Sequence, residues 1–352
     1  MNAVSPTPQS KRFPAFDVAV RGASIRYELH TQPQGLLLWR VTAFGDGSRV
    51  RCVIPFTQAN ALRELLAADD ALAQHSVNAR RLLAAARRHL SAGDFAPRLA
   101  LGRAPRVTLT AVSQRLEHAT GVFEMHDTLA AVARFLGLAG YAAVLGHWSD
   151  EDRTDLHWLG GIDPAWCMTF MNRHWYLNSA LLTHARATDR PAFGSEVPAV
   201  TEGQRLMRAT TLRFGLRCAI AFPRRLPPAT PAGSFGAVLF LGRTDPPAGE
   251  TGARRYATLV RGIVATFIDR WAQLIAAERA RQTRLSPTER RLLACVAARQ
   301  TTAQAAALLG IGTTAVNNHY RRINAKLGVN SKRAALARAQ ALGLLTEQPP
   351  PP

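Results

Sequence analysis

The chain has 352 residues, of which 47% are hydrophobic and 19% are charged. This composition is typical of globular proteins with two or three hydrophobic cores, so it excludes disorder except near the ends. Lysine and arginine number 44 against 24 aspartates and glutamates, and the resulting net charge of +20 suggests a polyanionic partner. The only lysines are Lys11, Lys326 and Lys332, however, and such an arginine excess also follows from nucleotide bias in a genome.

The four cysteines lie far apart in the sequence and show no paired spacing of the metal-binding or redox kind. We therefore expect Cys52, Cys167, Cys218 and Cys295 to be reduced and buried, and we expect neither a metal nor a cofactor. The first twenty residues lack the apolar run of a signal peptide, and no apolar run is long enough to cross a membrane. The sequence thus predicts a cytoplasmic protein without a membrane partner.

Apolar and polar residues alternate from Phe16 to Phe56, with glycines between the runs. This pattern predicts three or four antiparallel strands in a meander. Thr57 is the expected cap of a helical region from about 58 to 90, in which leucines supply a buried stripe. Residues 13–90 are therefore predicted to form a small αβ domain of unassigned role.

Residues 91–107 contain the prolines and glycines of a linker. In residues 108–281, strand-like runs alternate with helical segments. This alternation predicts an α/β/α sandwich, a central antiparallel sheet with helices on both faces. The expected strands are 141–148, 155–159, 218–222 and 237–241, and the expected helices between them are 164–172, 179–187 and 202–214.

The last helix of this domain, from 253 to about 281, carries one apolar stripe. Its members are Tyr256, Val260, Ile263, Phe267, Trp271 and Leu274. Such a stripe indicates either core packing or a dimer seam, and one long helix can provide both. A dimer would suit a protein that reads two DNA half-sites.

Residues 282–345 have the pattern of four short helices. Ser286 and Glu289 have the spacing of a capping box at the start of a helix that runs to about residue 299. A second helix begins at Thr301 or Thr302 and ends at a Gly-Ile-Gly turn, after which Thr313 caps a third. This layout is typical of a helix-turn-helix DNA-binding domain.

The third helix, predicted from Thr313 to Leu327, has two different faces. Its apolar residues recur at three- and four-residue spacing and should pack inward, while amide and guanidinium groups lie outward. Asn can hydrogen-bond to adenine and Arg to guanine, so the outer face could read base edges in the major groove. The basic residues at the next turn could bind DNA phosphates. The alternative is a packing module with a solvated basic face. The predicted DNA-binding residues are Thr313, Thr314, Asn317, Asn318, Arg321, Arg322, Lys326, Lys332 and Arg333.

Three motifs stand out in this C-terminal segment: Leu-Ser-Pro-Thr-Glu at its start, Leu-Gly-Ile at its centre and Lys-Leu-Gly-Val-Asn-Ser-Lys near its end. With them the segment resembles the DNA-binding domain of LuxR-type transcription regulators. The resemblance implies that Asn317, Asn318 and Arg321 face the bases. The chain departs from the family pattern at Arg299, where a helix-ending Gly is usual, and at Ala305 and Ala315, where a larger aliphatic residue and Thr are usual.

A second set of motifs lies between about residues 127 and 272. It comprises Trp166, the run from Trp175 to Ala185, Pro191-Ala192-Phe193 and Phe214-Gly215-Leu216-Arg217. With these motifs the segment resembles the autoinducer-binding domain of the same family. The resemblance implies a pocket for an acyl-homoserine lactone, with Trp166 at the position of a Trp that binds the head group.

The pocket positions depart from that pattern. Phe170 stands where the family has Tyr, Ser179 and Ala180 where it has Asp-Pro, Gly194 where a second Trp is usual, and Ala219 where a Gly is usual. A buried carboxylate that accepts an amide N–H contributes roughly 1.5–3 kcal/mol, and a Ser hydroxyl is a weaker acceptor. We therefore expect either a small-molecule signal other than a standard acyl-homoserine lactone or a pocket that has become ordinary core. The candidate ligand-binding residues are Trp166, Phe170, Trp175, Tyr176 and Ser179.

The chain has no Gly-x-Ser-x-Gly nucleophile motif, no glycine-rich phosphate-binding loop and no paired metal-binding spacing among its histidines, so we expect no enzyme. The sequence predicts an α+β protein: a small N-terminal β-meander with helices, a middle α/β/α sandwich and an all-α helix-turn-helix domain, followed by a disordered tail at 346–352. Its expected function is that of a bacterial transcription regulator, with promoter DNA, a second copy of the chain, a small-molecule signal and RNA polymerase as partners. The alternatives are a ligand-independent regulator and a protein that sequesters a partner regulator, with a sensing domain that serves only dimerisation.

Overall fold

The structure, a computed structural model, describes residues 13, 15–20, 22–32, 35–56, 59–73, 76–90, 105–147, 155–226, 234–283, 285–327, 329, 331–341, 344 and 345. These residues fall into two compact units, one that ends at Trp271 and one that starts at Ala272. The expected cap at Thr57, most of the expected linker and the expected tail lie outside the described residues.

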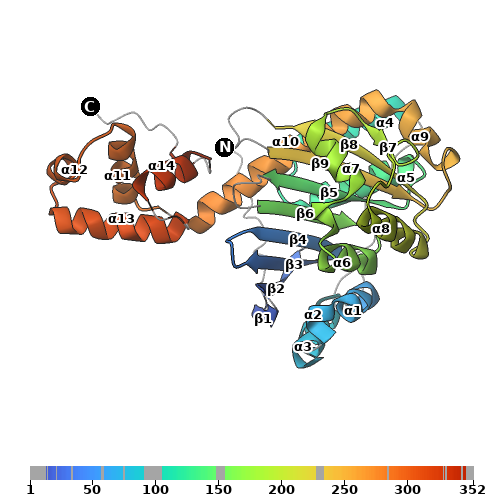
Figure 1. Cartoon of the computed structure of the whole chain (residues 1–352), viewed down its shortest axis with the longest axis horizontal. Helices are drawn as coiled ribbons and strands as arrows, with labels where there is room; N and C mark the ends of the chain where they lie inside the picture. The colour runs from blue at the N-terminus through green and yellow to red at the C-terminus, as the bar shows by residue number, and fades with distance from the viewer. Residues whose placement is uncertain are drawn as a thin grey trace, which may run out of the picture. The chain divides into compact units, whose positions relative to one another are not determined.

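Unit 1 is organised around one nine-stranded sheet with the order β1-β2-β3-β4-β6-β5-β9-β8-β7 (Figure 1). The strands are β1 (Phe16–Val20), β2 (Ala23–Gln32), β3 (Gly35–Phe44), β4 (Arg49–Phe56), β5 (Gly140–His147), β6 (Asp155–Gly161), β7 (Ala192–Phe193), β8 (Cys218–Arg225) and β9 (Ser234–Gly242). From β6 to β7 all neighbours pair antiparallel, which confirms the antiparallel sheet expected for the middle of the chain. The short strand β7 was not predicted.

The N-terminal strands β1 to β4 form the predicted antiparallel meander. They do not form a sheet of their own, because β4 pairs in parallel with β6, with Val50 opposite Leu156 and Cys52 opposite Trp158. An unpaired strand edge invites pairing with other chains. The N-terminal strands therefore continue the middle sheet and pair the edge of β6 that would otherwise lie open.

Helices cover both faces of the sheet, which confirms the predicted sandwich. On one face lies the helix α5 (Val122–Phe135), whose His126 Nδ1 is 3.0 Å from the hydroxyl of Tyr141 in β5. Ala142 and Val144 of the same strand point to the opposite face, where they share a core with Trp166. The helices up to the end of unit 1 are α1 (Ala59–Ala68), α2 (Asp70–Ala73), α3 (Ser76–Leu90), α4 (Pro105–Glu117), α5 (Val122–Phe135), α6 (Pro164–Asn172), α7 (Ala180–Ala187), α8 (Glu202–Arg213), α9 (Thr251–Arg255) and α10 (Ala257–Thr283), with 3-10 turns at Trp175–Leu177 and Ala248–Glu250.

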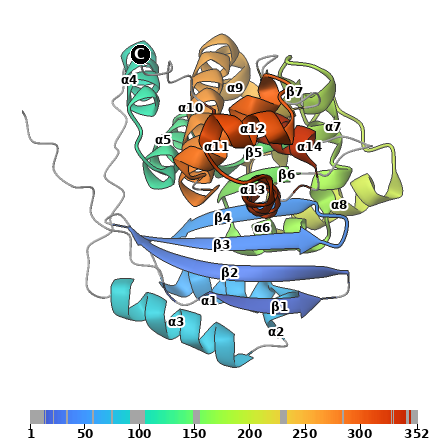
Figure 2. The same ribbon diagram turned by 90° about the vertical axis from the view of Figure 1, so that its left-hand side faces the viewer.

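The N-terminal helices lie on the same face of the sheet as α6. Leu62 and Leu65 of α1 belong to one buried core together with Tyr27 of β2 and Trp166 of α6. Helix α1 runs beside α6, below it in the first view (Figures 1 and 2). The single helical region expected for 58–90 is divided into α1, α2 and α3, and α4 begins at Pro105, inside the range expected to be linker.

The apolar stripe of α10 packs mainly inside unit 1. Val260, Ile263, Phe267 and Trp271 are at most 3% exposed, so these four side chains are core residues and are not accessible to a second copy. The helix expected from 253 is interrupted at Tyr256, between α9 and α10.

The four cysteines are free and buried, as expected. In the described part of the chain, no helix is long and apolar enough to cross a membrane. The described residues also contain no group of three or more His, Cys, Asp or Glu side chains that could hold a metal ion.

Unit 2 contains the four predicted helices, α11 (Pro287–Ala297), α12 (Thr302–Leu309), α13 (Thr313–Leu327) and α14 (Lys332–Ala341). Complete capping boxes precede two of them, Ser286 with Glu289 and Thr301 with Gln304. Gly310 ends α12 with a φ of 64°, in the left-handed region that favours glycine.

The expected cap at Thr313 is wrong by one residue. Thr313 is the first residue of α13, and the carbonyl of Gly312 accepts the N–H of Val316 at 3.1 Å. Gly312 therefore precedes the helix at the cap position, where glycine is tolerated.

Candidate functional site

Helix α13 has one buried face and one exposed face, as predicted. Its buried residues Val316, Tyr320, Ile323 and Leu327 are at most 6% exposed, and the Tyr320 hydroxyl donates to the carbonyl of Leu292 in α11 at 3.2 Å. The exposed residues are Thr313, Thr314, Asn317, Asn318, Arg321, Arg322, Ala325 and Lys326. Amide and guanidinium groups thus share one outward surface, which can pair with the edges of bases.

Lys326 forms an ion pair that joins α13 to α11. Its Nζ lies 2.8 and 2.6 Å from the two carboxylate oxygens of Glu289, whose side chain is 3% exposed. Burial raises the pKa of Glu289, but the hydrogen bonds from Lys326 and Ser286 outweigh it and hold the pKa below its usual range. Lys326, which the sequence assigned to a DNA phosphate, thus also connects two helices of the module.

Lys332 makes a second set of contacts within the module. Its Nζ donates to the hydroxyl of Thr302 at 2.9 Å and lies 4.3 Å from the ring centre of Tyr320. These contacts connect α14 to α12 and α13. Arg333, the next basic residue, is exposed.

Unit 1 contains a pocket of about 120 Å³, lined by residues of β6, α6, α7, α8, β8 and β9 and of the segment after β7. Most of the lining is apolar. None of the described lining residues carries a carboxylate or an imidazole. Apart from tryptophans and a cysteine, the polar side chains of the lining are those of Ser179, Gln204, Arg208, Thr211 and Arg217.

Three of the predicted ligand-binding residues line this pocket. The indole Nε1 of Trp166 donates to the hydroxyl of Thr211 at 3.1 Å. Phe170 stacks on Trp158, with 4.8 Å between ring centres. Ser179 is 3% exposed, and its hydroxyl makes no hydrogen bond with the described residues.

Trp175 and Tyr176 are placed differently. They are 4% and 5% exposed and belong to the core of unit 1, but they are not among the lining residues of the pocket. Gly194 does line the pocket, and a Cβ there would lie 2.8 Å from the carbonyl oxygen of Ala219. A large side chain at this position would therefore require the backbone to move.

The sequence did not point to the contribution of α8. Gln204, Arg208 and Thr211 of this helix line the pocket. Both ends of the Gln204 amide are hydrogen-bonded: its Oε1 accepts from the N–H groups of Val200 and Thr201, and its Nε2 donates to the carbonyl of Asn178. The sequence did carry one sign of how this helix begins, because Thr201 and Gln204 have the spacing of the capping box that they form.

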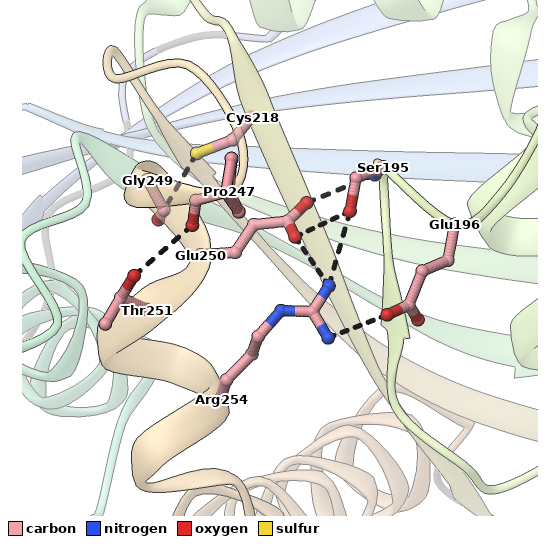
Figure 3. Close-up of polar contacts among 8 residues, drawn as sticks. All are labelled: Ser195, Glu196, Cys218, Pro247, Gly249, Glu250, Thr251 and Arg254. Atoms are coloured by element: carbon pink, nitrogen blue, oxygen red, sulfur yellow. Dashed lines mark hydrogen bonds and ion pairs between the residues drawn. The ribbon is translucent and has the colours of Figure 1, made fainter.

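A buried carboxylate holds the segment that follows β7 (Figure 3). Glu250, 0% exposed, accepts from the N–H and hydroxyl of Ser195 at 3.1 and 2.7 Å and from Arg254 Nη2 at 2.7 Å. Burial raises the pKa of Glu250, but these hydrogen bonds keep it below its usual range. Arg254 also pairs with Glu196 at 2.7 Å and lies over the Phe193 ring. This wall of the pocket is therefore attached to α9.

Two family models match the parts of the chain that contain the pocket and the helix α13. A family model described as an autoinducer binding domain matches residues 121–270, and one described as bacterial regulatory proteins, luxR family, matches residues 283–339. The chain is a LuxR-family regulator. It combines an autoinducer-binding domain with a helix-turn-helix DNA-binding domain, and neither family is enzymatic. The strands β1 to β4 and helices α1 to α4 precede the matched residues.

Solved structures of similar fold include two of SdiA. A crystal structure of Escherichia coli SdiA is 17% identical, with a TM-score of 0.48, over 68% of this chain and 98% of that chain. SdiA in complex with octanoyl-rac-glycerol is 15% identical, with a TM-score of 0.50, over 71% and 100%. CepR2 from Burkholderia cenocepacia, described as an N-acylhomoserine lactone dependent LuxR-family factor, is 18% identical, with a TM-score of 0.39, over 47% and 96%. The search of curated proteins gave no match.

Proposed function

We propose that this LuxR-family regulator reads promoter DNA as a homodimer, with the exposed face of α13 in the major groove. The exposure of Asn317, Asn318 and Arg321 on a helix whose other face is buried supports this role most directly. DNA phosphates would be bound by Thr313 and Thr314 at the start of the helix. Arg322 and the basic residues that follow it would bind phosphates at the other end. Contact with RNA polymerase would follow from binding at a promoter.

We further propose that a small molecule in the pocket of unit 1 controls DNA binding, and that this molecule is not a standard acyl-homoserine lactone. The Asp that the resemblance leads one to expect is replaced by Ser179, and no described lining residue supplies another carboxylate. The Trp166 N–H, which would bind the head group of a lactone, is bonded to Thr211.

The DNA-reading role can be tested with the full chain and a library of random duplexes. Sequences enriched by the wild-type protein define the target. N318A and R321A should each lose roughly 1–3 kcal/mol of discrimination per base contact. R290A, which removes an exposed Arg from α11, serves as the matched control and should keep the preference. An R321A protein that still prefers target over scrambled duplex to the wild-type extent would overturn the assignment of α13.

The same preparation tests the dimer and the alternative role. Sedimentation with and without the target duplex reports whether two copies bind together. A protein that fails to shift any duplex by itself, but binds another LuxR-type regulator, would favour the sequestering role. For the ligand, a large rise in melting temperature with a long-chain acyl-homoserine lactone would contradict the proposed change of signal.

A further inference from the structure

The unused polar groups of the pocket are mainly hydrogen-bond donors. Arg208 lines the pocket, is exposed, and forms no hydrogen bond or ion pair with the described residues. The other lining arginine, Arg217, already pairs with Asp245 at 3.2 Å. Arg208 is thus the lining guanidinium that the described part of the chain leaves without a carboxylate.

Two hydroxyls accompany this guanidinium. Ser179, almost completely buried, lines the pocket with a hydroxyl that has no partner among the described residues. Thr211 accepts a bond from Trp166, so its own O–H is left to donate, and it lies three residues from Arg208 on the same face of α8. The bond from Gln204 to the carbonyl of Asn178 connects α8 to the residue just before Ser179.

Apart from the Ser179 oxygen, the polar side-chain acceptors of the described lining already accept hydrogen bonds. Gln204 Oε1 accepts hydrogen bonds from two backbone N–H groups, and the Thr211 hydroxyl oxygen accepts one from the indole N–H of Trp166. A ligand amide N–H would therefore find chiefly the Ser179 oxygen. A carboxylate instead fits the available donors, because it offers only acceptors and can form a two-pronged, charge-assisted pair with a guanidinium.

We propose that the pocket binds an amphiphile with a carboxylate head and an apolar chain, in which Arg208 pairs with the carboxylate and Ser179 and Thr211 donate to it. The apolar chain would occupy the interior, between Trp166, Phe170 and Leu239. This inference rests on the proposed ligand-binding role and adds the chemical class of the ligand.

The test uses the full chain, with decanoate as the acidic probe and decanamide and N-decanoyl homoserine lactone as neutral probes, all below their aggregation concentrations. Decanoate should bind at least about tenfold more tightly than decanamide, with an affinity that falls as salt is added. R208Q should lose about tenfold in affinity for decanoate and leave decanamide binding unchanged. R213Q, which removes an exposed arginine of α8 outside the pocket, should bind decanoate as the wild type does.

Three outcomes would overturn the proposal. If decanamide or the lactone binds at least as well as decanoate, the pocket takes a ligand but does not select an acidic one, and ligand control stands. If R208Q binds decanoate as tightly as the wild type does, Arg208 does not pair with the carboxylate and the proposed site is wrong. If no probe binds while the target duplex is still recognised, the acidic ligand and the ligand-controlled part of the function both fail, and DNA reading remains.

Discussion

Asp69, the residue before α2, accepts a hydrogen bond from Nε of Arg40 in β3 at 3.1 Å, and both side chains are buried. Asp69 also accepts from the hydroxyl of Tyr27 at 2.7 Å. The same Arg40 donates through Nη2 to Asn172 at the end of α6, at 2.9 Å. The N-terminal strands and helices are thereby joined to the helix that carries Trp166 and Phe170, so the added region supports the pocket wall from behind.

This ion pair gives a stability prediction. D69N removes the negative charge and leaves the Arg40 guanidinium buried without its counter-ion, which costs about 3–5 kcal/mol in comparable buried pairs. The unfolding midpoint of the full chain in urea should fall accordingly. D70N changes the neighbouring carboxylate, which is exposed, and should alter the midpoint little. Equal midpoints for D69N and D70N would show that the pair does not stabilise unit 1.

Local patterns in the sequence were sufficient for most of the elements, but not for the way the sheet is assembled. Alternation between Phe16 and Phe56 predicts β1 to β4 because each antiparallel neighbour is also the next run in the chain. The parallel pairing of β4 with β6 joins segments separated by about a hundred residues. Neither strand carries a local signal for that partner, since a parallel pair needs no turn between its strands.

The same distinction applies to the pocket. Trp166, Phe170 and Ser179 were accessible from the sequence because the resemblance to a known family assigns each of these positions to the pocket. Arg208 and Thr211 lie on α8, a polar helix in which Gln204 is the buried residue, so no apolar stripe shows which face is turned inward. The pair of Lys326 and Glu289 also escaped prediction, because the exposed-face pattern of α13 does not indicate a partner in another helix.

The ion pair of Lys326 predicts a loss of stability beyond any loss of DNA contact. K326A leaves Glu289 buried with only its capping bonds, which should destabilise unit 2 by about 1–2 kcal/mol, less than for a fully buried pair because Lys326 is 39% exposed. Calorimetry of the full chain measures the effect. R333A, which removes an exposed basic residue, should lower the affinity for duplex DNA without lowering the melting temperature. A K326A protein with an unchanged melting temperature and weaker DNA binding would assign Lys326 to the phosphates alone.

The bond between Trp166 and Thr211 predicts a measurable change at the pocket. T211V keeps the shape of the side chain but removes the acceptor, so the indole N–H loses its partner at a cost of about 1 kcal/mol. The melting temperature should fall, whereas T211S, which retains the hydroxyl, should restore it. T210V changes the neighbouring, half-buried Thr and controls for loss of a hydroxyl on α8. A T211V protein as stable as the wild type would mean that water replaces Thr211 at the indole.

Arg299, the residue after the C-cap of α11 at Ala298, adopts a φ of 56° at the position where the family usually has glycine. Its N–H bonds to the carbonyl of Val296 at 3.0 Å, and the N–H of Gln300 bonds to that of Cys295 at 2.9 Å, so this conformation closes the helix. A residue with a side chain in the left-handed region destabilises the folded state by roughly 1–2 kcal/mol. Glycine avoids this strain, but it also increases the conformational entropy of the unfolded chain, which offsets part of the gain in stability. R299G should therefore stabilise unit 2 by about 0.5–1 kcal/mol. Calorimetry of R299G and of Q300G, which places glycine where φ is not positive, should show a rise in melting temperature for the first and no rise for the second.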